Sequence, residues 1–180
     1  MKIIAISGSL RAASHNTAVL QAARRLAPTG VEIVLFEGIG QLPFFNSDLE
    51  GERLPEVVTR FRTAIGAADG LLISSPEYAR GVSGVMKNAL DWLVGSHEFP
   101  GKPVALINTS PRATHALESL SITLETMSAQ LVRDASITLP LLGTTNDAAS
   151  IAANAEFAAP LRSALERYAE AIRTFADEES

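Results

Sequence analysis

The sequence contains no cysteine among its 180 residues. Disulfide bonds, thiolate nucleophiles, iron–sulfur ligation and cysteine-ligated zinc are therefore excluded. The absence of cysteine also fits a reducing compartment, and we expect a cytoplasmic protein. Aromatic residues (6%) and charged residues (19%) are scarce, but hydrophobic residues make up 47% of the chain, which is enough to bury a substantial core.

Long hydrophobic runs and an excess of positive charge are also missing. No stretch approaches the roughly 20 apolar residues of a membrane helix. The apolar run after Lys2 stops at Ser7, too early for a secretory signal. The formal net charge of −5 gives no general attraction to nucleic acid or acidic membranes. The three histidines are scattered and no His-Glu-x-x-His motif occurs, so we predict neither a metal site nor a catalytic triad.

Short apolar runs alternate with longer segments of helical periodicity. The runs predict buried strands at residues 2–7, 31–36, 70–75 and 104–109, with a weaker strand at 135–139. The periodic segments predict helices at residues 16–26, 54–68, 82–93, 113–131 and 152–175. Continuous apolar runs indicate strands that are covered on both faces. We therefore predict one α/β domain over residues 1–180, a doubly wound five-stranded parallel sheet with helices on both faces.

Ligands of such sheets bind beyond the carboxyl ends of the strands, where three predicted loops meet. The first loop carries glycine, arginine and small polar residues at the start of a helix: Gly8, Ser9, Arg11, Ser14, Asn16 and Thr17. We expect Gly8 to adopt backbone angles closed to other residues. Free N–H groups, the helix dipole and the Arg11 guanidinium favour a phosphate monoester. In the alternative interpretation Ser14 or Asn16 only caps the helix and Arg11 is a solvated charge.

The loop after the third predicted strand has features suited to a planar ring. Pro76 stiffens the exit from the strand, and Glu77 and Tyr78 follow at the sheet edge. Tyr78 offers an aromatic surface, and Gly81 permits close backbone approach. The alternative for Tyr78 is packing beneath the loop.

The first loop matches neither the Walker motif nor G-x-G-x-x-G. This argues against ATP hydrolysis and against a dinucleotide bound in the Rossmann manner.

Two longer motifs give the chain a family resemblance. The first, G-S-x-R-x-x-S-x-N, is carried by Gly8, Ser9, Arg11, Ser14 and Asn16. The second, P-E-Y-x-x-x-x-x-G-x-x-K-N-A-x-D-W, is carried by Pro76, Glu77, Tyr78, Gly84, Lys87, Asn88, Ala89, Asp91 and Trp92. In both motifs and in their separation, the chain resembles the NADPH-dependent FMN reductase family, which includes quinone and chromate reductases.

The resemblance implies a flavodoxin-like fold, non-covalently bound FMN, and homodimers or homotetramers. It implies that the FMN phosphate is surrounded by Ser9, Arg11, Ser14, Asn16 and Thr17, and the isoalloxazine by Pro76, Glu77, Tyr78 and Gly81. It also implies hydride transfer from NADPH or NADH to FMN, and then to a quinone, free flavin, azo compound or metal oxyanion. Because the flavin carries this chemistry, the protein needs no catalytic acid or base for the first half-reaction.

The third loop, residues 108–116, departs from the family pattern. Relatives often carry a serine followed by several glycines that approach the pyrimidine edge of the flavin. Here Ser110 matches, but Pro111, Arg112 and Ala113 follow it, and Pro111 lacks an N–H. Arg112 is expected either to offset charge on reduced flavin, to reach a nicotinamide-nucleotide phosphate, or to be a plain surface charge. This departure leaves open both the affinity for flavin and the identity of the electron acceptor.

Other residues near the predicted loops have two interpretations each. His15 lies in the phosphate loop and is a candidate ligand there. Arg80 is predicted to meet the phosphates of NAD(P)H, with a solvated loop arginine as the alternative. For the whole protein, the competing functions are an FMN-binding electron carrier and a ligand-binding module without NADPH turnover. Arg11 and the modest negative charge favour the reductase over a carrier.

Apolar residues in two predicted surface segments indicate assembly or an acceptor pocket. The segment after the third helix is expected to expose Val94 and Phe99, with Trp92 at a core position or a subunit contact. The segment Leu-Pro-Phe-Phe-Asn, residues 42–46, adds Phe44 and Phe45. Contiguous exposed apolar surface of this kind often marks an interface. We therefore predict at least a homodimer.

Overall fold

The computed structural model describes residues 1–141, 143 and 147–178. Its central sheet consists of β1 (Lys2–Ser7), β2 (Glu32–Leu35), β3 (Gly70–Ser74) and β6 (Pro103–Asn108), with two short strands, β7 (Gln130–Leu131) and β8 (Ile137–Thr138), both paired with β6. All these pairings are parallel, in the order β2-β1-β3-β6-β7. This is the strand order of the flavodoxin-like class of doubly wound sheets. The predicted fold is confirmed.

The fifth strand position differs from the prediction of one strand at residues 135–139. It is divided into β7 and β8 by a 3-10 turn, η4 (Arg133–Ala135). The hydroxyl of Ser136 occupies the gap, accepting a hydrogen bond from the Leu106 N–H (3.1 Å) and donating to the Val132 carbonyl (3.0 Å). A side chain therefore replaces the backbone in the strand ladder at this point.

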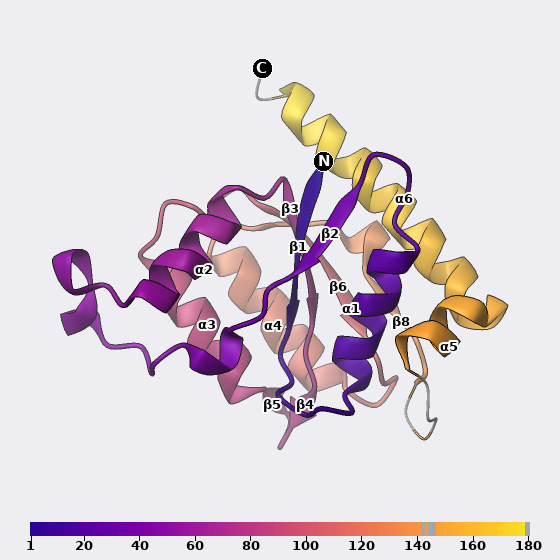
Figure 1. Cartoon of the computed structure of the whole chain (residues 1–180), viewed down its shortest axis with the longest axis horizontal. Helices are drawn as coiled ribbons and strands as arrows, with labels where there is room; N and C mark the ends of the chain where they lie inside the picture. Colours follow the sequence, from indigo (N-terminus) through magenta and orange to yellow (C-terminus); the bar gives the residue numbers. More distant parts are fainter. Residues whose placement is uncertain (142, 144–146, 179–180) are drawn as a thin grey trace.

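Helices cover both faces of the sheet (Figure 1). One face packs against α1 (His15–Arg25), α5 (Ala148–Ala153) and α6 (Ala155–Glu178), and the other against α2 (Glu56–Gly66), α3 (Gly84–Val94) and α4 (Thr114–Thr126). Strand β1 shows the division, because Ile3 and Ala5 join the first core cluster and Ile4 and Ile6 the second. Burial on both faces explains why the strands are continuous apolar runs.

Three predicted helices match the structure to within two residues at each end, and the other two differ by more. The predicted helix 113–131 ends at Thr126, and Ser128 adopts a left-handed φ of 66° that turns the chain back toward β7. The predicted helix 152–175 is divided, because residues 152–153 belong to the separate helix α5 and α6 begins at Ala155. The interruption lies at Asn154, whose side chain accepts from the Glu156 N–H (2.9 Å). Local turn chemistry ends both helices where apolar periodicity alone predicts continuation.

Tyr168 of α6 is buried against the sheet between β3 and β6. Its hydroxyl lies 2.7 Å from the Leu71 carbonyl oxygen and 2.8 Å from the Pro103 carbonyl oxygen. A Cβ on Gly70 would lie 2.5 Å from the same hydroxyl, so glycine is required at the start of β3 for this close packing. Burial raises the pKa of Tyr168, because an ionised phenolate would lose its hydration there.

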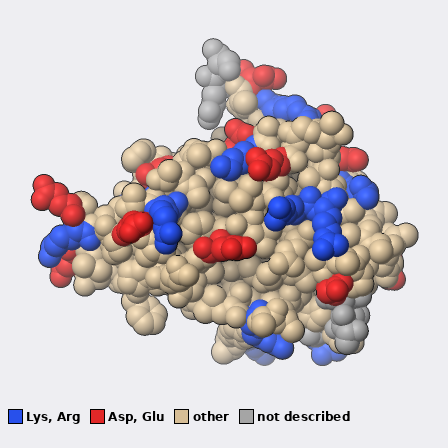
Figure 2. Space-filling view, in the orientation of Figure 1, with Lys and Arg blue, Asp and Glu red and all other residues tan. Residues whose placement is uncertain are grey.

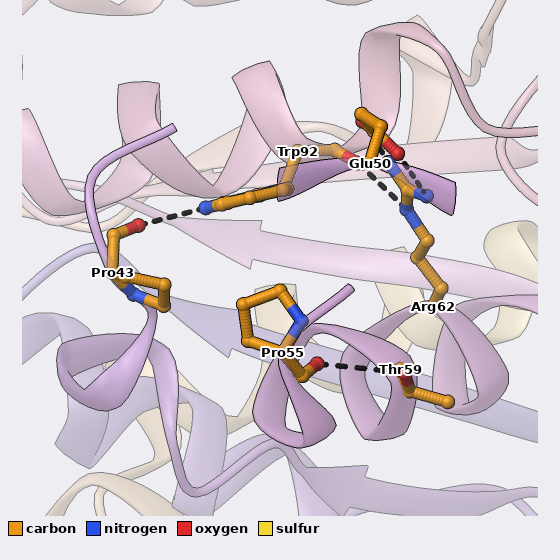
Figure 3. Close-up of polar contacts among 6 residues, drawn as sticks. All are labelled: Pro43, Glu50, Pro55, Thr59, Arg62 and Trp92. Atoms are coloured by element: carbon orange, nitrogen blue, oxygen red, sulfur yellow. Dashed lines mark hydrogen bonds and ion pairs between the residues drawn. The ribbon is translucent and has the colours of Figure 1, made fainter. Parts of the chain in front are cut away.

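A long connection between β2 and α2, residues 36–55, projects to one side of the molecule (Figure 1). Figure 3 shows how it is held: the indole Nε1 of Trp92 donates to the Pro43 carbonyl (2.7 Å), and the Arg62 guanidinium donates to both carboxylate oxygens of Glu50 (2.8 and 3.0 Å). Arg62 also donates to the carbonyl of Trp92 (2.7 Å from Nη2). Helix α3 therefore fixes the projecting segment through side chains and its own backbone.

Only some of the apolar residues that the sequence predicts at the surface are exposed. Phe99 is fully buried, which corrects that expectation, and Trp92 takes the core position rather than a subunit contact. Both lie in the core cluster beneath α3, because the chain after this helix folds back onto the sheet. Phe44 (90% exposed) and Val94 (65%) are on the surface as predicted. Within the described residues, none of the helices is long and apolar enough to cross a membrane.

Candidate functional site

The loops after β1, β3 and β6 enclose a cavity of about 310 Å³ at the carboxyl ends of these strands. The cavity brings together ten of the predicted site residues: Ser9, Arg11, Ser14, His15, Asn16, Pro76, Glu77, Tyr78, Ser110 and Arg112. Thr17, Arg80 and Gly81 lie outside its lining. Residues that the sequence did not single out also line it, namely Ser75, Asn108, Thr109 and Ala113. Ser75, Asn108 and Thr109 share the signal of position, since each lies at or directly after the end of a strand, whereas Ala113 is the N-cap of α4.

The first loop is built tightly around Gly8. The Gly8 N–H donates to the Ser74 carbonyl (2.8 Å), and its own carbonyl accepts from the Ser83 hydroxyl (2.7 Å). A Cβ at this position would lie 2.4 Å from the Ser75 Oγ and 2.9 Å from the Ser83 Oγ. Gly8 is not among the glycines with positive φ. The expectation of unusual backbone angles is therefore wrong, and glycine is required by lack of space.

Helix α1 begins directly above this loop with its N-terminus at the cavity. Ser14 is the N-cap, and its hydroxyl accepts from the Thr17 N–H (3.3 Å), so the predicted cap is confirmed. Ser14 and His15 also line the cavity together with Arg11, whose side chain forms no ion pair with any described residue. Capping and anion binding use the same helix end, so the two interpretations of this loop are compatible.

Asn16 of α1 links the ends of β3 and β6. Its side-chain oxygen accepts from the hydroxyls of Ser74 (2.9 Å) and Thr109 (3.3 Å), and the residue is almost fully buried. Thr17 is bound in a similar way, with its hydroxyl 2.8 Å from that of Ser7 at the end of β1. These contacts fix the relative positions of α1, β3 and β6 beneath the cavity.

The second loop is a β-hairpin, which sequence reasoning missed. Strands β4 (Glu77–Tyr78) and β5 (Gly81–Val82) pair antiparallel across a two-residue turn. The turn residues Ala79 and Arg80 have φ values of 50° and 60°, a left-handed conformation that costs L-residues about 1–2 kcal/mol each. Asn-Gly is the usual signal for such a turn, and it is absent here. Tyr78 is 54% exposed, so the alternative that it packs beneath the loop is wrong.

Glu77 connects the hairpin to the third loop. Its Oε2 accepts from the Ala116 N–H (2.9 Å) in the first turn of α4. The helix has no side-chain cap of its own, because its N-cap residue is Ala113. A carboxylate at a helix N-terminus is favoured by the free N–H groups and the helix dipole.

The third loop is held in one conformation by Asn108. The Asn108 amide donates to the Ser110 carbonyl (2.7 Å), and its oxygen accepts from the Ser110 N–H (3.2 Å). The N–H groups of Arg112 and Ala113 donate to the Ser110 hydroxyl (3.2 Å) and carbonyl (3.1 Å). In place of flexible glycines, this chain therefore has a turn closed by its own hydrogen bonds.

The residues present fit a phosphate-bearing planar group such as FMN. The helix N-terminus, Ser9 and Arg11 supply donors and positive charge for a phosphate. His15 adds an imidazole whose Nδ1 is buried without a hydrogen-bond partner among the described residues. Pro76 and Tyr78 add flat apolar surface on the opposite loop. Among the described residues, no three His, Asp or Glu side chains are close enough together to hold a metal ion.

The fold and this cavity define the class of flavodoxin-like proteins that bind a ligand at the carboxyl ends of a doubly wound sheet. Comparison with known proteins gives the family. Residues 1–141 match the family described as NADPH-dependent FMN reductase, and the chain belongs to it. The resemblance inferred from the two motifs is therefore confirmed.

Named relatives carry reductase activities. An NAD(P)H-dependent FMN reductase of Pseudomonas aeruginosa is 45% identical over 112 residues, covering 61% of this chain and 60% of the relative. A 2-hydroxy-1,4-benzoquinone reductase of a Burkholderia species is 43% identical over 113 residues, covering 61% of each. The chain thus spans about 60% of the length of these curated relatives. The flavoenzyme NAD(P)H:(acceptor) oxidoreductase FerB from Paracoccus denitrificans has a similar structure, with TM-score 0.78, 27% identity and coverage of 97% of this chain and 98% of that one.

Proposed function

We propose that this protein is an FMN-dependent NAD(P)H oxidoreductase. It passes hydride from NADPH or NADH to bound FMN and then to a small-molecule acceptor, a quinone, free flavin, azo compound or metal oxyanion. The observation that carries the proposal is the single cavity that joins the N-terminus of α1 to the hairpin and to the third loop. Membership of the NADPH-dependent FMN reductase family and the names of the relatives support the same activity.

In this proposal the chain binds and orients the cofactor. Ser9, Arg11, Ser14 and the α1 N-terminus hold the phosphate, while Tyr78 and the third loop flank the ring. Bound FMN supplies the hydride-accepting chemistry. Arg80 is proposed to meet the phosphates of the nicotinamide nucleotide, because the hairpin turn presents it at the surface beside the cavity residues Glu77 and Tyr78.

An FMN-binding electron carrier is the second candidate, together with a binding module without turnover. Carriers of this fold present strongly acidic surfaces, whereas Figure 2 shows acidic and basic side chains interspersed on the face drawn. Arg11 in the cavity lining, which forms no ion pair with any described residue, also favours an enzyme that handles phosphate-bearing cofactors.

The test is the absorbance spectrum of the protein after incubation with FMN and removal of the excess, followed by anaerobic NADPH and, separately, NADH. A retained flavin band that bleaches with either nucleotide supports the oxidoreductase. A retained band that neither nucleotide bleaches supports the carrier. Failure to retain FMN, together with no NADPH oxidation in the presence of free FMN and a quinone, contradicts both.

We also propose that the protein forms a homodimer or homotetramer in the cytoplasm. Helices α3 and α4 border a surface groove lined by Lys87, Asp91, Val94 and Ile122, and the last two are more than half exposed. Apolar side chains at such a groove favour burial against a second copy. The Lys87–Asp91 pair (2.5 Å) adds charges of both signs, so a twofold-related copy would meet complementary charges. Light scattering at micromolar concentration tests this, and a monomer mass contradicts it.

A further inference from the structure

Residues 110–113 of the third loop offer the site a side-chain cation but no free backbone donor. Within residues 110–113, the N–H groups of Ser110, Arg112 and Ala113 are all used inside the loop, at 3.1–3.2 Å. Pro111, between them, has no N–H. Any hydrogen bond that this part of the loop gives to a ligand must therefore come from a side chain.

The positive charge of Arg112 in the cavity lining is not compensated. Its side chain forms no ion pair with any described residue. Glu77 is the carboxylate in the same lining, and it already accepts a hydrogen bond from the Ala116 N–H (2.9 Å). The guanidinium is therefore a free cation with several N–H donors, positioned by a turn with a fixed conformation.

The polarity of the cavity walls predicts how a flavin ring would lie. With the phosphate at the N-terminus of α1, the ring extends between the hairpin and the third loop, since these complete the lining. The hairpin side presents Pro76, Tyr78 and Glu77, whose carboxylate already accepts from the Ala116 N–H, whereas the third loop presents the Ser110 hydroxyl and the Arg112 guanidinium as donors. The flavin ring has one apolar edge and one polar edge, and burial favours polar atoms next to hydrogen-bond donors. The polar edge of a bound flavin would therefore face the third loop.

We propose that the Arg112 guanidinium bonds this polar edge and stabilises the negative charge that reduction places on the ring. The inference rests on the proposed function. A hydride carries two electrons and one proton, so its transfer leaves NAD(P)⁺ and adds one negative charge to the neutral ring. Arg112 keeps its own proton and balances that charge. Arg112 thereby binds reduced FMN more tightly than oxidised FMN and raises the reduction potential of the cofactor.

The test compares Arg112→Gln with the unsubstituted protein, each reconstituted with FMN. The reduction potential is measured anaerobically against a reference dye, and the affinity for oxidised FMN by fluorescence quenching. We expect Arg112→Gln to weaken the binding of reduced FMN about tenfold more than the binding of oxidised FMN. For a two-electron couple this difference lowers the reduction potential by about 30 mV. Arg112→Lys keeps the charge and is expected to retain most of the potential. The matched control is Arg11→Gln, which is expected to weaken the binding of oxidised and reduced FMN equally and so to leave the reduction potential unchanged.

An unchanged potential in Arg112→Gln overturns the inference, and a raised KM for NADPH in that variant would assign Arg112 to the donor instead. If Arg112→Gln no longer retains FMN, the Arg112→Lys variant tests the charge effect in its place. Retention of FMN by the lysine variant near the original potential supports the charge effect, and an equal loss of FMN overturns it. Failure of the unsubstituted protein to bind FMN is a separate result, because it removes the proposed function first.

Discussion

Replacement of Gly8 by alanine tests whether the first loop is fixed by close packing against the second. The new Cβ would lie 2.4 Å from the Ser75 Oγ and 2.8 Å from the Ser75 Cβ. Rotation of the serine hydroxyl relieves the first contact only, because the Ser75 Cβ is attached to the backbone. The strand end must therefore move, which strains the hydrogen bonds of Gly8 to Ser74 (2.8 Å) and Ser83 (2.7 Å).

The expected cost of Gly8→Ala follows from these contacts. Overpacking costs about 1–3 kcal/mol, and a weakened buried hydrogen bond adds about 1 kcal/mol, so we expect about 2–4 kcal/mol of lost stability. Urea denaturation measures this loss, and fluorescence quenching measures the accompanying loss of FMN affinity. The control is Gly84→Ala, because a Cβ there meets nothing within 4 Å and alanine favours the helix that it begins.

A second substitution identifies the clash as the cause. Ser75→Gly removes both the 2.4 Å and the 2.8 Å contacts and leaves only the 2.9 Å approach to Ser83. In the Gly8→Ala background it should restore at least about 1 kcal/mol, a coupling that independent sites do not show. A Gly8→Ala variant within about 0.5 kcal/mol of the unsubstituted protein, or no recovery in the double variant, would refute the reasoning.

Three further predictions concern single side chains. Arg80→Ala should raise the KM for NADPH more than it lowers FMN content, and an unchanged KM removes Arg80 from the donor site. Tyr168→Phe should cost about 1–2 kcal/mol of stability at neutral pH. Because burial raises the pKa of Tyr168, the folded state keeps its proton when the unfolded chain loses it. The free energy of unfolding is therefore undiminished below about pH 10 and falls above it by up to about 1.4 kcal/mol per pH unit. Urea titrations at alkaline pH should show that Tyr168→Phe removes this slope and that Tyr78→Phe keeps it. Trp92→Phe should cost about 2–3 kcal/mol, because the smaller ring leaves a cavity in the core and the Pro43 carbonyl loses its indole donor (2.7 Å). It should also speed amide exchange in residues 42–46, and unchanged exchange would contradict this role.

The sheet and most of the cavity were predictable because they depend on burial and chain order. Strands covered on both faces must be apolar throughout, so β1, β3 and β6 are visible as runs in the sequence. Once the strands are placed, a parallel sheet brings the loops at their carboxyl ends together. The weak edge position was only half predicted, since β7 is two residues long and Ser136 supplies part of the ladder through its side chain.

The hairpin and the third loop were not predictable in detail, because their conformations depend on contacts distant in sequence. Ala79 and Arg80 carry no turn signal of their own. Their left-handed conformation is supported instead by the pairing of β4 with β5 and by the bond from the Ala116 N–H to Glu77. The role of Asn108 is equally hidden, because an asparagine at the end of a strand gives no indication that its side chain closes the following turn.

The second motif combines residues of the site with residues of its scaffold, and only the structure separates them. Pro76, Glu77 and Tyr78 line the cavity, whereas Asn88 and Trp92 lie outside its lining and donate instead to the Pro43 carbonyl (3.0 and 2.7 Å). Ser83 joins the two groups, since its hydroxyl caps α3 and donates to Gly8 of the first loop. Helix α3 therefore fixes the projecting segment 36–55 at one side and the cofactor loops at its N-terminus. Substitutions at Asn88 should accordingly change the stability of that segment without changing FMN affinity, although the residue belongs to the same motif as Tyr78.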